Sequence, residues 1–125
     1  MNTTRKKKKT SWGFHLLLDA SHCDPDAIRS KKTIAEFVKK MVKEINMIAY
    51  GGPRIVKFGT GKRRGYTLVQ LIRTSDITAH FSEEEGSAYV DVFSCKPFDP
   101  KKAIQVFRSF FHPERIHTKF LTRQA

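Results

Sequence analysis

Three side chains in one short stretch of the sequence are of types that take part in covalent and proton-transfer chemistry. Ser75 carries a hydroxyl that can act as a nucleophile, His80 follows five residues later, and Cys95 lies fifteen residues beyond the histidine. Histidine transfers protons near neutral pH, where an ordinary thiol is mostly protonated and can donate its proton. Each residue type alone is more often structural than catalytic. The joint spacing of the three therefore defines the candidate site.

Two strands are expected to position these residues. Residues 67–72 and 88–93 are rich in β-branched and aromatic side chains with polar residues interleaved, a pattern typical of half-buried strands. The segment between them is expected to turn at Gly86. We therefore expect the two strands to pair and to bring the serine, the histidine and the cysteine together near the strand ends.

This stretch resembles the small prokaryotic form of S-adenosylmethionine decarboxylase, a family that makes its own pyruvoyl cofactor. The typical family core reads Glu-Ser-His-x-x-x-His-Thr-aromatic-Pro-Glu, followed by a strand that ends Val-Asp-Val-Phe-Thr-Cys. The matching residues here are Thr74, Ser75, Asp76, His80, Phe81, Ser82, Glu83, Glu84 and the strand Val90, Asp91, Val92, Phe93, Ser94, Cys95. The resemblance extends from Gly13 to about Phe111.

The resemblance implies that the chain cuts itself between Thr74 and Ser75. The serine hydroxyl would attack the carbonyl before it, and the resulting ester would eliminate and hydrolyse to a pyruvoyl group at position 75. His80 would transfer the proton in the elimination. Thr67 stands where the family usually has a helper serine and keeps the hydroxyl.

The resemblance also implies how a substrate would be decarboxylated. The pyruvoyl group would accept electrons as carbon dioxide leaves, and Cys95 would return a proton to the product. Glu84 matches a glutamate that contacts ribose, and Asp76, Phe81 and Phe58 are further candidates for substrate contact. S-adenosylmethionine is the expected substrate, and its product would supply the aminopropyl group for spermidine synthesis.

Departures from the family pattern leave the substrate open. Asp76 replaces the usual histidine, and Glu83 stands in place of the proline. Three consecutive acids, residues 83–85, favour any cationic substrate, so ornithine or arginine remain alternatives. A solvated acidic turn that contacts no ligand is the non-functional interpretation.

Composition predicts one domain. The 125 residues are 39% hydrophobic, which is enough for a core without metal or disulfide support. We expect a basic, disordered tail over residues 1–11 and a single domain over residues 12–125. The net charge of +12 includes five consecutive charges at residues 5–9. It leaves two rivals to an active enzyme: a non-enzymatic, basic nucleic-acid-binding homologue, which is not favoured, and an unprocessed subunit.

Helical periodicity and capping residues complete the expected fold. A helix is predicted from Pro25 to Tyr50, with a capping box at Thr33 and Glu36, and a second one starts at Pro100 and ends before Pro113. Further strands are expected at residues 12–20, 54–58 and 114–121. The predicted fold is α+β, a two-layer sandwich with an antiparallel sheet and both helices on one face. The open face is expected to pair with that of a second subunit in a homodimer.

Neither cysteine is in a spacing typical of zinc sites, so no metal site is predicted. The basic start lacks the apolar core of a signal peptide, and no apolar run is long enough to span a bilayer. We therefore expect a cytoplasmic protein, without membrane attachment, in which Cys23 and Cys95 are reduced.

Overall fold

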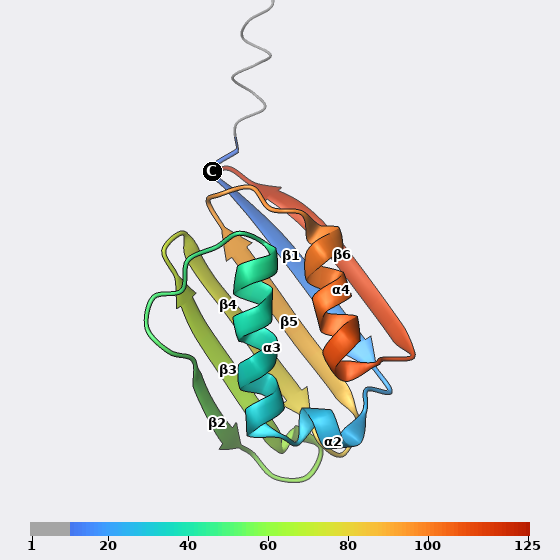
Figure 1. Ribbon diagram of the computed structural model, residues 1–125. Helices are drawn as coiled ribbons and strands as arrows, with labels where there is room; N and C mark the ends of the chain where they lie inside the picture. Colours follow the sequence, from blue (N-terminus) through green and yellow to red (C-terminus); the bar gives the residue numbers. More distant parts are fainter. Residues whose placement is uncertain (1–10) are drawn as a thin grey trace, which may run out of the picture.

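The computed structural model describes residues 11–125, so residues 1–10 of the tail predicted over residues 1–11 lie outside this range. Six strands form one antiparallel sheet in the order β2-β3-β4-β5-β1-β6 (Figure 1). Their bounds are β1 Gly13–Ser21, β2 Arg54–Phe58, β3 Gly65–Ile72, β4 Ser75–Ser82, β5 Ser87–Ser94 and β6 Arg115–Arg123. Every neighbouring pair of strands is antiparallel, as predicted.

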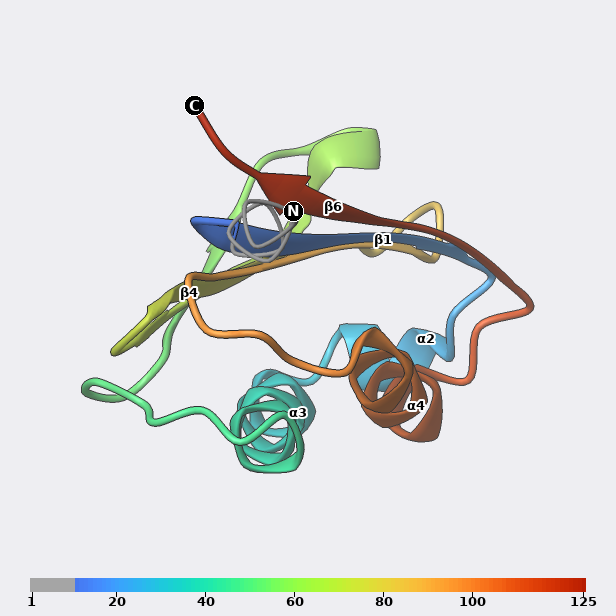
Figure 2. The same ribbon diagram turned by 90° about the horizontal axis from the view of Figure 1, so that it is seen from above.

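The helices α2 (Pro25–Ile28), α3 (Lys31–Glu44) and α4 (Pro100–Phe111) all cover the same face of the sheet. In Figure 2 the sheet lies above and these three helices lie below it, so none of the three covers the second face. The predicted two-layer α+β sandwich is confirmed. Side chains of Asp24, Ser30 and Asp99 cap the three helix starts by accepting backbone N–H bonds.

The core lies between the helices and the sheet. Phe37 of α3 contacts Phe107 and Phe111 of α4 at ring-centroid distances of 5.8 and 5.0 Å. Strand alternation sends every second side chain, such as those of Leu16, Leu18, Ile77, Ala79, Val90 and Val92, into this layer. Because these positions alternate with outward-facing residues, the register also fixes which side chains lie on the open face.

Two details of the predicted fold are wrong. The strands over residues 67–72 and 88–93 do not pair with each other, because β4 lies between them and pairs with both. Its sequence, SDITAHFS, alternates buried apolar residues with polar residues that face away from the helices, which is itself a strand pattern that the prediction did not use. The single helix predicted from Pro25 to Tyr50 is instead two helices, α2 and α3, and Ser30 caps α3 in place of the predicted capping box at Thr33 and Glu36. The second helix ends at Glu44, and Asn46, with a φ of 60°, adopts a left-handed conformation that stops it.

The open face of the sheet carries several exposed apolar side chains. Leu71, Tyr89 and Leu121 are between 42% and 50% exposed on this side, and Leu17 is half-buried. No helix among residues 11–125 is long and apolar enough to cross a membrane. The described part of the chain thus has one packed face and one uncovered face.

Candidate active site

Thr74 and Ser75 lie at the tight turn between β3 and β4. Ile72 pairs directly with Ser75, so only Arg73 and Thr74 form the turn. Ser75 has a backbone φ of 152°, a value that residues other than glycine rarely adopt. The backbone is therefore strained at the Thr74–Ser75 bond that the resemblance marks for cleavage.

Cys95 lies beside this bond because β5 pairs with β4. Ser94 is the register partner of Ser75, and the next backbone N–H, that of Cys95, donates a 2.9 Å hydrogen bond to the carbonyl oxygen of Thr74. The Cys95 side chain is exposed. The structure thus brings Thr74, Ser75 and Cys95 together, as the sequence predicted.

His80 and Thr67 form a second group at the other end of the hairpin. They are direct register partners, and Thr67 Oγ1 lies 3.3 Å from His80 Nδ1 on the open face. His80 is five residues along β4 from Ser75, which corresponds to about 16 Å at the usual rise of a strand. Within one chain the histidine therefore does not meet the serine, contrary to the expected convergence of all three residues.

A pocket of about 320 Å³ adjoins the His80 end. Its walls include Phe58, Tyr66 and Tyr89 together with Thr67 and His80. Aromatic walls of this kind suit a planar or cationic group. Phe58 is 58% exposed, so its ring is available to a ligand, as the substrate-contact prediction requires.

Phe81 does not have the exposed ring that a stacking role needs. It is 3% exposed, and its ring centroid lies 5.2 Å from that of Phe111 in the core. Strand alternation explains the difference, since His80 faces outward and the following residue must face the helices. The Phe81 ring is therefore not exposed for stacking on a substrate, although the residue borders the pocket.

The three acidic residues at 83–85 have different environments. Glu83 is largely buried, and its carboxylate pairs with Lys57 at 2.7 Å and with Arg64 at 3.7 Å. Its backbone N–H also bonds the Arg64 carbonyl at 3.0 Å, so Glu83 fastens the basic loop to the β4–β5 turn. Glu84 and Glu85 remain exposed beside it. A cationic ligand would therefore meet two exposed carboxylates here, not three.

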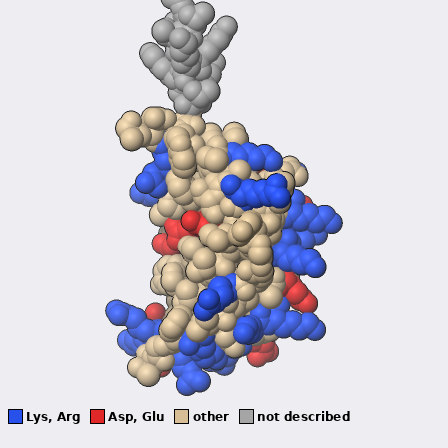
Figure 3. All heavy atoms as spheres, turned by 90° about the vertical axis from the view of Figure 1, so that its left-hand side faces the viewer, with Lys and Arg blue, Asp and Glu red and all other residues tan. Residues whose placement is uncertain are grey.

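Basic side chains surround this end of the sheet. Figure 3 looks onto the edge formed by β2, where blue lysine and arginine side chains outnumber red acidic ones. Arg54, Lys57 and residues 62–64 are exposed on β2 and on the loop that follows it. This loop contains a short 3-10 turn, Gly61–Arg63, and connects the antiparallel strands β2 and β3.

A polar network that sequence analysis did not identify lies at the centre of the open face. His15 Nε2 contacts Asp91 Oδ1 at 2.9 Å, and Arg123 approaches His15 Nδ1 at 3.1 Å. Burial raises the pKa of Asp76, the neighbouring His15 lowers it, and the neighbouring Asp91 raises it further. The sequence feature that could have indicated this network is Asp91, a carboxylate between Val90 and Val92 in an apolar strand.

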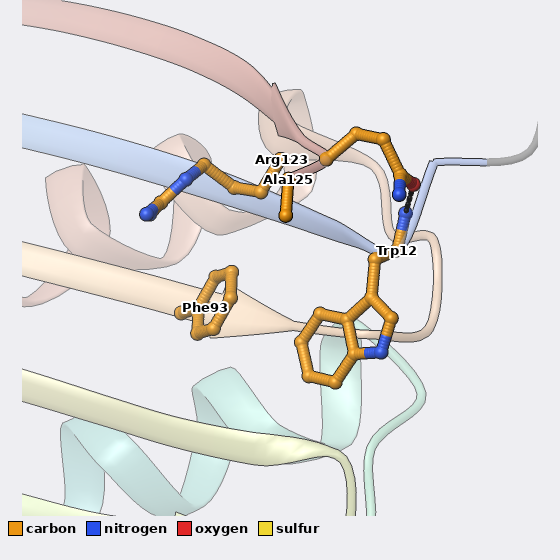
Figure 4. Close-up of a pocket in the computed structure, with 5 residues that line it drawn as sticks. Trp12, Phe93, Arg123 and Ala125 are labelled. Atoms are coloured by element: carbon orange, nitrogen blue, oxygen red, sulfur yellow. Dashed lines mark hydrogen bonds between the residues drawn. The ribbon is translucent and has the colours of Figure 1, made fainter.

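A second hollow of about 410 Å³ lies at the Cys95 end of the same face. Trp12 and Phe93 wall it with ring centroids 5.9 Å apart, and the Arg123 guanidinium lies 5.3 Å from the Phe93 ring (Figure 4). Gly13 forms part of this region because a Cβ there would come within 2.9 Å of the Phe93 ring. A side chain at position 13 would therefore force the Phe93 ring to move.

The two cysteines are not bonded to each other. Cys23 is buried, which raises the pKa of its thiol to about 11, whereas Cys95 is exposed. No group of three or more His, Cys, Asp or Glu side chains suited to a metal ion occurs within residues 11–125.

The fold places a strained serine next to a carbonyl group that accepts a hydrogen bond from the Cys95 N–H. These features define a class of small α+β proteins with a candidate self-cleavage site at a hairpin turn. Residues 14–124 match the family model described as S-adenosylmethionine decarboxylase. The chain belongs to this family of decarboxylases.

Known relatives agree with this assignment. The S-adenosylmethionine decarboxylase proenzyme of Pyrococcus furiosus is 30% identical over 89% of this chain and 78% of its own length. The proenzyme of Pyrobaculum aerophilum is 32% identical over 86% of this chain and 85% of its own length. The crystal structure of the adenosylmethionine decarboxylase from Aquifex aeolicus VF5 superimposes with a TM-score of 0.78 at 28% identity, covering 93% of both chains.

Proposed function

We propose that this protein is a self-processing, pyruvoyl-dependent decarboxylase that acts on S-adenosylmethionine and supplies the decarboxylated product for spermidine synthesis. The observation that carries the proposal is the Thr74–Ser75 bond, whose carbonyl oxygen accepts the Cys95 N–H while Ser75 has a φ of 152°. A donor at this position stabilises the negative charge that develops when a nucleophile attacks the carbonyl carbon. Strain in the peptide favours its conversion to an ester.

Self-cleavage begins when Ser75 Oγ attacks the Thr74 carbonyl carbon. The C–N bond breaks, the freed amine takes up the proton of the hydroxyl, and Thr74 becomes esterified to Ser75. Removal of the Ser75 α-proton then expels Thr74 as a carboxylate, and water replaces the nitrogen to leave a ketone and ammonia. His80 is the proposed base, and Thr67 orients its ring through the 3.3 Å contact.

The pyruvoyl group formed from Ser75 supplies an electron sink for the decarboxylation. The residues around it fit this cofactor, because the serine precursor and the polarised carbonyl are both in place. Cys95 is the proposed proton donor to the product carbon, since its exposed side chain follows the register partner of Ser75.

A homodimer would complete the site. The pair formed by Thr78 and Asp91 lies between the Ser75 end and the His80 end of the open face. A two-fold packing of open faces that reverses the strand direction would place the Ser75 end of one subunit over the His80 end of the other. It would also cover the exposed Leu71 and Tyr89.

The substrate would lie between these two ends. The pocket walled by Phe58, Tyr66 and Tyr89 is proposed to hold the adenine ring. Glu85 lines this pocket, and the preceding residue, Glu84, is the proposed ribose contact. The exposed carboxylates of Glu84 and Glu85 suit the sulfonium charge. Ornithine and arginine share the α-amino acid group and a positive charge, but they lack the adenine and ribose that the pocket and Glu84 are proposed to contact.

Release of labelled carbon dioxide from S-adenosylmethionine, ornithine and arginine tests the proposal in a single assay. The proposal predicts release from S-adenosylmethionine alone, and none from the Ser75→Ala variant. Release from an amino acid with none from S-adenosylmethionine would instead assign the chain to a decarboxylase of basic amino acids.

A further inference from the structure

A chain of side-chain hydrogen bonds holds Thr74, the residue that carries the scissile carbonyl. The hydroxyl of Ser94 lies 2.7 Å from Thr74 Oγ1, and Thr74 Oγ1 lies 3.4 Å from Met47 Sδ. The backbone N–H of Lys96 donates to Ser94 Oγ at 3.0 Å. Thr74 is thus held through its side chain as well as through its carbonyl.

The end groups and the distances together give the direction of these bonds. The Lys96 N–H can only donate, so the Ser94 hydroxyl accepts from it. Of the two acceptors within reach of the Ser94 proton, Thr74 Oγ1 at 2.7 Å is closer than Met47 Sδ at 3.7 Å. The Thr74 hydroxyl then donates to Met47 Sδ, which can only accept. Each hydroxyl therefore donates one bond and accepts one bond.

Burial makes this arrangement rigid. Ser94 is 0% exposed and Met47 is 8% exposed, so water does not compete for the bonds. Met47 is itself fixed, because its backbone N–H bonds the Val42 carbonyl at the end of α3 at 2.9 Å. The side chain of Thr74 is therefore tied to β5 on one side and to the helix layer on the other.

We propose that Ser94 is a positioning residue for self-cleavage, which holds Thr74 so that the strained Ser75 keeps its hydroxyl next to the Thr74 carbonyl carbon. This inference rests on the proposed function. The step it affects is the acyl shift, in which the Ser75 Oγ–carbonyl bond forms, the Thr74–Ser75 C–N bond breaks and the hydroxyl proton passes to the new amine. Without the Ser94 bond, Thr74 can rotate and the reactive geometry is populated less often.

Ser87 provides a matched control on the same strand. It begins β5 as Ser94 ends it, and it is also buried, at 7% exposed. Its hydroxyl has no hydrogen-bond partner within residues 11–125. The Ser87→Ala variant therefore removes a buried strand-end hydroxyl without touching Thr74.

The test compares cleavage rates of the full chain, followed by intact-mass spectrometry after fresh synthesis. Loss of one neutral hydrogen bond is expected to slow Ser94→Ala by roughly three- to tenfold, whereas Ser87→Ala should cleave at the wild-type rate. Thr74→Val keeps the branched shape but removes the hydroxyl, so it should be slowed similarly even if Ser94→Ala folds poorly. The double variant should be no slower than the slower single variant, because both substitutions break the same bond.

Hydroxylamine identifies the affected step. It cleaves the ester once the acyl shift has occurred, so in excess hydroxylamine the cleavage rate reports the shift alone. The proposal predicts that Ser94→Ala remains slow under this condition. If wild type and Ser94→Ala cleave equally fast, or if the two substitutions slow cleavage independently, the positioning role is wrong while the proposed function stands. If the wild-type chain is never cut, the proposed function itself fails.

Discussion

The backbone N–H of Cys95 donates a 2.9 Å hydrogen bond to the carbonyl oxygen of Thr74, although the two residues are far apart in the sequence. Antiparallel pairing of β4 and β5 creates this contact, since Ser75 and Ser94 are register partners and their neighbours meet at the turn. Cys95 thereby has two separable groups near the reactive bond, a backbone donor and a side-chain thiol. These groups would serve different stages of the proposed chemistry.

Replacing Cys95 by alanine should separate those stages. The Cys95→Ala variant keeps the backbone N–H, so self-cleavage should continue, but decarboxylation should fall by about a hundredfold or more because the proton donor is lost. Fragment masses report the first effect and labelled carbon dioxide reports the second. Cys23→Ala, which removes the other thiol from the protein, should keep its turnover. An uncut Cys95→Ala chain would contradict the division of roles.

Mixed dimers should show whether the site is shared between subunits. The Ser75→Ala chain keeps His80, and the His80→Ala chain keeps Ser75, so each should stay uncut alone. When the two are coexpressed, the His80→Ala chain should be cut, because the partner supplies its histidine across the open face. Mass spectrometry distinguishes the two chains. If coexpression restores no cleavage, or if His80→Ala is cut alone, the shared site is wrong.

Phe58 and Phe81 should respond in different ways to truncation. Phe58→Ala removes an exposed pocket wall and should raise KM for S-adenosylmethionine by about three- to tenfold with little change in stability. Phe81→Ala leaves a cavity against Phe111 and should lower the free energy of unfolding by about 3–5 kcal/mol. Steady-state kinetics and denaturant unfolding measure the two effects. An unchanged KM in Phe58→Ala would remove that residue from the substrate site.

The raised pKa of Asp76 predicts a pH-dependent stability. The folded state binds this proton more tightly than the unfolded state, so ionisation of Asp76 should destabilise the fold as the pH rises above about 4. In an uncleavable Ser75→Ala background, Asp76→Asn should therefore increase the free energy of unfolding at pH 7. The gain should shrink as the pH is lowered toward 4. Equal gains at both pH values would show that ionisation of Asp76 is not the cause.

The layers of the fold and the Ser75–Cys95 end of the site could be predicted from the sequence. Periodic apolar residues placed the helices, and the spacing of Ser75 and Cys95 agrees with a resemblance that the family match confirms. The strand β4 was not predicted, although Ile77, Ala79 and Phe81 alternate with polar residues as in a half-buried strand. Once β4 was missed, the partners of β3 and β5 were also missed.

The rest of the site depends on register, which local sequence does not determine. The separation of His80 from Ser75 and the burial of Phe81 both follow from strand alternation along β4. The contact between His15 and Asp91 joins β1 to β5 across 76 positions of sequence. Such pairs become visible only when the strand order is known.

The most direct test of the account is the intact mass of the wild-type chain after prolonged incubation. Self-cleavage at Ser75 predicts two fragments, residues 1–74 with a free carboxylate and residues 75–125 with a pyruvoyl group at the start, while Ser75→Ala stays whole. A wild-type chain that keeps its full mass, under conditions in which it is folded, would contradict the account.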